Sequence, residues 1–362
     1  IYYDEFSDAI LANIEGLRPI HDSDYVKITM ALTNAGFKEP PKDRLRNVIR
    51  AIANDNKIDT AKEWALNRKW DGIARCENLF STYFGCPDSE FCRAVGNYFT
   101  TAMAGRILNA GTKADSIPII IGKQGSYKST AMAALSPFPS SFGEIDLSQR
   151  DDNLARQIKG KLIIAIDELR GFGAKEVTAI KHFITRQEDE WRPLWSEFTV
   201  KNQRRCVFIA STNDMEFLTD MTGNRRYLPL TQVANCDPRL LEKDREQIWA
   251  EAIQTFRTSG VLWEEAQRLC GATHLAHLIT DDILIGQIEK VLDSCLSPSA
   301  TREFEIFLMC DLTERLYGSG QFLDRKRQMA LASAVGTLGF EKRPLRINGK
   351  LTKVWARVSA TL

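Results

Sequence analysis

The pattern of apolar and polar residues changes character near residue 110. Before this point, apolar residues recur at helical spacing, as in residues 44–54 (RLRNVIRAIAN) and 90–108 (EFCRAVGNYFTTAMAGRIL). Side chains three and four positions apart share one face of a helix, so both segments predict amphipathic helices. The sequence therefore predicts a mainly helical region over residues 1–110.

Between residues 111 and 235, short apolar runs alternate with amphipathic segments. Runs of this length, rich in Ile and Val, are typical of strands buried on both faces of a parallel sheet. Their alternation with helical segments favours an α/β domain. The runs are IPIII (117–121), KLIIAID (161–167), RCVFIAST (205–212) and RRYLPL (225–230).

After the α/β segment, residues 236–297 again have helical spacing, and CLSPSATRE (295–303) has the composition of a linker. Residues 298–362 predict two helices and then two alternating runs on either side of Asn348-Gly349. An Asn-Gly pair between alternating runs is a strong hairpin signal. Helices followed by a basic hairpin predict a small winged-helix-like domain.

Composition limits the classes of partner. The chain has 362 residues with 48 Lys and Arg against 47 Asp and Glu, so a protein coated in positive charge for duplex DNA is excluded and any nucleic-acid contact must be local. No apolar run approaches the ~20 residues that span a bilayer, so no membrane is expected as a partner. The eight cysteines are scattered without a Cys-x-x-Cys pair, which is typical of reduced thiols in the cytoplasm. The start IYYDEFSDAI has no initiator Met, so we expect an upstream domain.

A phosphate-binding loop is predicted at residues 122–129 (GKQGSYKS). The apolar run before it supplies a strand, Gly122 and Gly125 supply the turn, and the helix that follows adds its dipole. Lys128 would reach the β and γ phosphates, and the Ser129 hydroxyl would bind Mg²⁺. By itself, such a match could also arise by chance.

Tyr127 departs from the usual loop pattern, which has glycine directly before the lysine. A residue at the junction of loop and helix needs no glycine if its backbone is already helical. We therefore expect Tyr127 in a right-handed helical conformation, as a local variation in a working nucleotide site.

Two acids, Asp167 and Glu168, follow the second apolar run. The carboxyl ends of parallel strands face the ligand crevice, so Asp167 would hold Mg²⁺ through water and Glu168 would polarise the attacking water. The alternative is a solvated loop. Asn213 directly follows the third run, and its amide would contact the γ phosphate or align the water.

A pair of arginines, Arg225 and Arg226, stands just before the last apolar run. A guanidinium fork suits the charge that develops on a transferring phosphoryl group, and in a ring one of the pair would reach the neighbouring subunit's nucleotide. The alternative is a surface pair held by acids.

Several segments together resemble the virulence-associated E family of phage, plasmid and pathogenicity-island replication proteins. The resemblance covers roughly residues 60–260 and is carried by KWDGIAR, GKQGSYKST, AIDEL, FITRQEDEWRPLW and STNDMEFLTDMTGNRRYLPL. It implies an AAA+ (superfamily III-like) P-loop NTPase core, ring assembly that is usually hexameric, and ATP- and Mg²⁺-dependent DNA unwinding in replication. Many members of the family carry a primase or polymerase domain upstream.

The resemblance also implies roles at matching positions. The nucleotide would be bound by Gly122, Gly125, Ser126, Tyr127, Lys128, Ser129 and Thr130; the metal by Ser129 and Asp167; and catalysis would use Glu168, Asn213, Arg225 and Arg226.

The resemblance places a DNA-contacting hairpin between the second and third runs. Lys201, Arg204 and Arg205 would contact single-stranded DNA in a central pore, with Trp191 and Trp195 as aromatic faces. Tryptophans are more often core or interface residues, so this assignment has a structural alternative. The basic C-terminal hairpin, with Arg343, Arg346, Lys350 and Lys353, is either a wing against a DNA backbone or a solvated charged face.

The sequence thus favours the helicase part of a primase-helicase. An ATP-dependent origin-binding or loader protein with weak hydrolysis is the alternative, and a monomeric phosphotransferase is disfavoured because it would not need a trans arginine.

Overall fold

The computed structural model describes residues 1–14, 16–147, 149–167, 182–191, 199–213, 226–274, 282–298, 304–318, 323, 325–347 and 350–358. They divide into two compact units: the first contains the described residues up to 266 except 226–229, and the second contains 226–229 and the described residues from 267 onward. In this part of the chain, no helix is long and apolar enough to cross a membrane.

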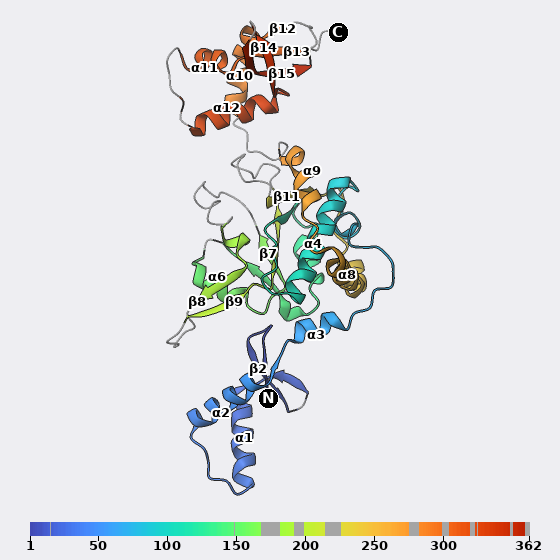
Figure 1. Ribbon diagram of the computed structural model, residues 1–362, viewed down its shortest axis with the longest axis vertical. Coiled ribbons are helices and arrows are strands. Elements are labelled where there is room, and N and C mark those ends of the chain that lie inside the picture. Colours follow the sequence, from blue (N-terminus) through green and yellow to red (C-terminus); the bar gives the residue numbers. More distant parts are fainter. Residues whose placement is uncertain are drawn as a thin grey trace. The chain divides into compact units, whose positions relative to one another are not determined.

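The first unit begins with a small four-stranded sheet of order β3-β2-β1-β4. Its strands are β1 (Tyr2–Asp4), β2 (Ala9–Asn13), β3 (Leu17–Pro19) and β4 (Lys57–Ile58). Helices α1 (Asp22–Asn34) and α2 (Lys42–Asp55) lie between β3 and β4 in the chain and are labelled with β2 in Figure 1. The sequence did not predict this sheet, because strands of two to five residues are too short to show a clear alternation. The helix predicted at residues 44–54 is confirmed as α2, whose buried residues Leu45, Ile49 and Ala53 recur every four positions.

Helices α3 (Thr60–Leu66) and α4 (Glu90–Leu108) follow, with a π-helical turn (Leu79–Tyr83) between them. Fifteen of the residues of α4 are buried, which confirms the helix predicted there and places it in the core. Helix α8 (Pro238–Ser259) packs against α4, and its Trp249 indole donates to the Leu135 carbonyl at 2.9 Å. The first part of the predicted helical extension therefore belongs to the same unit as the central sheet.

The central sheet has five strands in the order β11-β5-β10-β7-β6. Figure 1 labels β7 and β11 of this sheet. The pairs β5–β10, β10–β7 and β7–β6 are parallel, and every residue of β5 and β10 is buried. This arrangement confirms the predicted α/β class and the four apolar runs as strands. The strands are β5 (Ile117–Ile121), β6 (Phe142–Ile145), β7 (Ile163–Asp167), β10 (Val207–Thr212) and β11 (Tyr227–Thr231).

Shorter helices, turns and strands lie between the strands of this sheet in the chain. Helix α5 (Lys128–Ala134) follows β5, a 3-10 turn (Pro139–Ser141) precedes β6, and α6 (Asp151–Gln157) precedes β7. Strands β8 (Glu188–Trp191) and β9 (Val200–Gln203) pair as a separate antiparallel ribbon. Helix α9 (Glu264–His274) spans the division between the two units.

After α9, the described residues of the second unit combine α10, α11 and α12 with an antiparallel sheet of order β12-β13-β15-β14. The predicted C-terminal hairpin is confirmed as β14 and β15, which pair from Glu341↔Ala356 to Ile347↔Lys350; Asn348 and Gly349 lie outside the described residues. The elements are α10 (Asp282–Cys295), β12 (Ser297–Pro298), β13 (Phe304–Phe307), α11 (Met309–Tyr317), α12 (Arg325–Thr337), β14 (Glu341–Ile347) and β15 (Lys350–Val358).

One expectation about this unit needs correction. Ser297 and Pro298, inside the segment predicted as a linker, form a strand paired with β13. Ile288 and Leu292 of α10 are buried in the same apolar cluster as Phe307 and Leu312. Pro and Ser are compatible with a short edge strand, so the composition of the segment did not show that it is part of the fold.

Candidate nucleotide-binding site

The loop between β5 and α5 has two glycines with different reasons to be glycine. Gly125 has a φ of +81°, in the left-handed region that side chains rarely adopt. A Cβ on Gly122 would lie 2.1 Å from the Gln232 Oε1 atom, so a larger residue there would displace the Gln232 side chain. The loop shape therefore depends on both positions that the sequence identified.

Tyr127 does not have the conformation that we expected. It is the N-cap of α5 with φ 63° and ψ 24°, which is left-handed, whereas the expectation was right-handed helix. The left-handed region costs a non-glycine residue about 1–2 kcal/mol, since Cβ approaches the following carbonyl oxygen. Tyr127 thus has a backbone conformation that glycine adopts more easily. Its side chain is 59% exposed.

Lys128 begins α5, and its ammonium group lies inside the loop. The Nζ atom donates to the carbonyl oxygens of Gly122 at 2.7 Å and Lys123 at 2.8 Å, and to Asn213 Oδ1 at 3.1 Å. The side chain is largely buried although it is charged. A buried ammonium is stable when oxygen atoms surround it, so these contacts hold the positive charge at the loop.

Gln232, which follows β11, is hydrogen-bonded to the loop. The sequence by itself did not identify this residue. Its Oε1 atom accepts from the Ser126 hydroxyl at 2.8 Å, and its Nε2 group donates to the Phe84 carbonyl at 2.8 Å. The backbone N–H of Cys236 donates to the Ser126 carbonyl at 3.0 Å. No local pattern marks Gln232, because its loop partner is 106 positions away in the chain.

The Cys236 thiol accepts a hydrogen bond from the Gln232 amide. Burial raises the pKa of this thiol to about 11, while the hydrogen bond from Gln232 and the charge of Lys128 act in the opposite direction. The thiol is therefore uncharged at neutral pH and does not neutralise Lys128.

A cavity of about 560 Å³ opens above the loop. It is lined by Gln124, Gly125, Ser126, Tyr127, Lys128, Ser129, Thr130, Ser211, Thr212 and Asn213. Within the described part of the chain, the backbone N–H groups of Gly125 and Tyr127 donate to no other protein group. A loop with unengaged N–H groups, a helix start and a lysine has the chemistry of a phosphate site.

The strand ends bring further predicted residues to the same edge of the sheet. Asn213 follows β10 directly, and Asp167 ends the neighbouring β7, level with Ser211. Thr212 is level with Ile121 at the end of β5. Since these strands are parallel, their carboxyl ends meet at the loop.

Other predicted catalytic residues have no described contact with this cavity. Glu168 and Arg225 lie outside the described residues. Arg226 directly precedes β11 and is partly buried. The predicted roles of these residues stay predictions, as do those of Asp167 and Asn213. The described residues contain no group of three or more His, Cys, Asp or Glu side chains that could hold a metal ion by themselves.

The predicted DNA contacts on the β8–β9 ribbon divide into two kinds. Arg204 is wrong as a DNA contact: its side chain is fully buried, ion-paired with Asp189, and stacked near Phe183 and Phe208. An arginine enclosed in this way cannot reach a phosphate, because its guanidinium already has its carboxylate partner inside the protein. Arg204 instead anchors the base of the ribbon.

Arg205 and Lys201 differ in how far their side chains are exposed to solvent. Arg205 pairs with Asp59 at 2.5 Å and is only 17% exposed, so its charge is also engaged within the protein. Lys201 is 60% exposed, with Glu188 and Glu190 at 3.7 and 3.5 Å. Of the three predicted contacts, Lys201 is the one whose side chain is open to a ligand. The side chain of Trp191 and all of Trp195 lie outside the described residues.

Comparison with known proteins places the sequence in a family. It matches the virulence-associated protein E-like domain over residues 65–277. It is similar to the apo structure of the NrS-1 C-terminal region (305–718), with 13% identity and a TM-score of 0.46, covering 99% of this chain and 95% of that chain. The A form apo structure of the same region gives 14% identity and a TM-score of 0.40 with the same coverage. No curated protein matches the chain. Because the family match spans more than half of its length, the chain belongs to the virulence-associated protein E-like domain family.

Proposed function

We propose that this chain is the ATP-driven motor of a DNA helicase that acts in replication of a phage or mobile element. The observation that carries the proposal is the 3.1 Å contact between Lys128 Nζ and Asn213 Oδ1. It joins the phosphate-binding loop after β5 to the polar residue after β10, across adjacent strands. A lysine and an amide that meet where the strand ends converge are placed to hold and sense one terminal phosphate.

The cavity fits a nucleoside triphosphate and Mg²⁺ in its chemistry. The N–H groups of the loop would hold phosphate oxygens, and Lys128 would exchange its carbonyl contacts for the β and γ phosphates. Ser129 and Asp167 would hold Mg²⁺, which neutralises charge on the phosphates when bound. Glu168 would polarise the attacking water, and Arg225 or Arg226 would act in trans.

Ring assembly, single-stranded DNA in a central pore and an upstream primase or polymerase domain are parts of the same proposal. Their support is the family membership together with Lys201, which is exposed on a ribbon that Arg204 anchors. A ring would bring several copies of Lys201 together, so DNA binding needs no large net charge in the single chain.

Tyr127 favours a second candidate function. Its left-handed backbone lies directly before Lys128. If the loop has to change shape during each cycle of hydrolysis, this constrained residue would slow the change and therefore the turnover of ATP. An ATP-dependent origin-binding or loader protein needs ATP binding and assembly but little hydrolysis. The two functions differ in one measurable property, which is stimulation of hydrolysis by DNA.

The test compares Lys128→Ala with Lys123→Ala, an exposed lysine of the same loop. We expect Lys128→Ala to lower ATP turnover by at least ~100-fold, and Lys123→Ala to stay within about threefold of the parent. Undiminished turnover in Lys128→Ala would remove the site assignment. Single-stranded DNA should raise turnover of the parent and support strand separation on a forked duplex. Binding of ATP with turnover that DNA leaves unchanged would favour the loader.

A further inference from the structure

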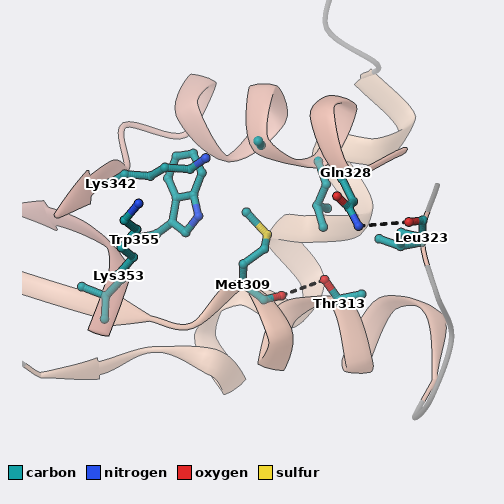
Figure 2. A pocket seen from close by; sticks show the side chains of 10 residues that line it. Met309, Thr313, Leu323, Gln328, Lys342, Lys353 and Trp355 are labelled. Carbon is teal, nitrogen blue, oxygen red and sulfur yellow. Dashed lines mark hydrogen bonds between the residues drawn. The ribbon is translucent and has the colours of Figure 1, made fainter. Parts of the chain in front are cut away.

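A second cavity, of about 610 Å³, lies in the second unit between α11, α12 and the β14–β15 hairpin. Its size falls in the range of ~300–1,000 Å³ typical of ligand pockets. Figure 2 shows Lys342, Lys353 and the Trp355 indole together on the hairpin side, and Thr313, Gln328 and Leu323 on the other side, with Met309 between them. The cavity therefore has a cationic end and an apolar body.

The apolar body is built from side chains and not from loop backbone. Leu323, Leu331 and Trp355 are buried members of its lining, and Met309 is partly buried. Leu331 and Trp355 also belong to the core cluster of the unit, so the floor of the cavity is continuous with a packed core. Such a floor keeps its shape whether or not a ligand is bound.

The two lysines lie on one face of the hairpin. Lys342 is opposite Trp355, and Lys353 is opposite Pro344, two positions further along the same ladder. Because side chains alternate between faces of a strand, these positions share a face, while Arg343 points to the other face. Both lysines are exposed, and no described lining residue of the cavity is acidic.

The surrounding sequence strengthens this positive charge. Residues 325–357 contain nine basic residues and one acidic residue, although the whole chain is nearly neutral at +1. The ligand should therefore carry negative charge close to its apolar part.

The polar groups inside the cavity favour an apolar insert over a nucleobase. The Thr313 hydroxyl donates to the Met309 carbonyl at 2.7 Å, and the Gln328 amide donates to the Leu323 carbonyl at 3.0 Å. The Thr313 hydroxyl proton and one of the two Gln328 amide N–H groups are therefore engaged within the protein. The Lys342 ammonium lies 5.1 Å from the centre of the Trp355 ring, so it occupies a face on which a base would stack.

We propose that this cavity binds an acidic peptide segment of a partner protein, with one large apolar side chain in the cavity and its neighbouring carboxylates on Lys342 and Lys353. The apolar side chain buries itself against Met309, Leu331 and Trp355, and the two ammonium groups fix its flanking charges. A nucleic-acid backbone would use the surface charge of the hairpin but would have no use for the apolar body.

The test uses the full chain and a short fluorescein-labelled peptide of aspartate and glutamate residues that ends in Leu-Phe. We expect saturable binding by fluorescence anisotropy. A probe that ends in Leu-Ala should bind at least ~10-fold more weakly, because the anchor is lost. Lys342→Glu and Lys353→Glu should each weaken binding by at least ~10-fold, since each places a like charge beside the carboxylates.

Two controls keep the result specific. Arg343→Glu makes the same charge change on the opposite face, and binding should stay within about threefold of the parent. Ala332→Phe fills the cavity without changing charge and should abolish binding, with an unchanged melting midpoint as evidence that the unit is folded. Absence of peptide binding would overturn the proposal, as would equal affinity for the Phe and Ala probes. Displacement of the peptide by oligothymidylate, with equal losses in Lys342→Glu and Arg343→Glu, would identify a nucleic-acid surface instead.

Discussion

The Ser126 hydroxyl donates a hydrogen bond to the Gln232 amide oxygen at 2.8 Å, which fixes the loop between β5 and α5 to the segment after β11. The same hydroxyl contacts the Lys123 carbonyl at 2.9 Å, within the loop itself. Gln232 continues the connection to the Phe84 carbonyl, just after the π-helical turn. A segment distant in the chain therefore holds the loop in place at Ser126, two positions before Lys128.

Gln232→Leu should raise the apparent Michaelis constant for ATP about fivefold and leave the maximal turnover within about twofold of the parent. Loss of one hydrogen bond beneath the loop corresponds to about 1 kcal/mol. Steady-state hydrolysis over a range of ATP concentrations gives both constants. Gln254→Leu, at an exposed position of α8, is the matched control and should change neither. A fall in turnover with an unchanged Michaelis constant would show that Gln232 acts on chemistry and not on loop shape.

Tyr127→Gly should stabilise the protein. Glycine adopts the observed φ of 63° without the cost that Cβ imposes, so we expect the melting midpoint to rise by about 1–3 °C. Tyr127→Ala keeps Cβ and should give no such increase, which separates backbone strain from loss of the ring. Differential scanning calorimetry measures both. Equal stabilisation by Gly and Ala would mean that the exposed ring, and not the backbone, carries the cost.

Arg204→Met should destabilise the first unit by about 3–5 kcal/mol, because it leaves the buried Asp189 carboxylate without its partner. Denaturant unfolding followed by intrinsic fluorescence measures the change. Adding Asp189→Asn to the same chain should recover part of the loss, since it removes the uncompensated charge. Normal stability of the single variant would mean that the pair is not enclosed as described.

Lys201→Ala should weaken single-stranded DNA binding without changing the melting midpoint, because this lysine is exposed on the ribbon. Loss of one phosphate contact should reduce the salt dependence of the affinity by about one unit of slope. Binding titrations at several salt concentrations measure this slope. Lys38→Ala, at another exposed lysine, is the control. An unchanged slope in Lys201→Ala would exclude the ribbon as the DNA contact.

The start of α1 should lose stability in acid. Hydrogen bonds from the Arg18 guanidinium and the His21 N–H hold the pKa of Asp24 well below its usual range. A carboxyl whose pKa is lowered in the folded state stabilises it above the unfolded pKa of about 3.9, and this contribution fades as the pH falls through the folded value. Amide exchange of α1 should therefore show falling protection below about pH 4. Asp24→Asn should remove this pH dependence, whereas Asp22→Asn, at an exposed acid of the same turn, should keep it.

Local patterns were sufficient for most elements of the fold. The buried strands of the central sheet are runs of Ile and Val that need no tertiary information to be recognised, and the β14–β15 hairpin follows from an Asn-Gly pair between alternating runs. The small N-terminal sheet and the strand β12 were not predictable in this way. Their stability comes from pairing with residues distant in the chain, such as Asp4 with Ile58, and not from their own composition.

The sequence by itself determined the loop, its lysine and the polar residues at the strand ends, because glycine, charge and strand length act locally. The tertiary structure alone decided that Gln232 supports the loop, that Tyr127 is left-handed and that Arg204 is enclosed by Asp189. A charged residue looks the same in a sequence whether it faces solvent or a buried carboxylate. What separates the two cases is packing between distant segments, and that packing exists only once the chain has folded.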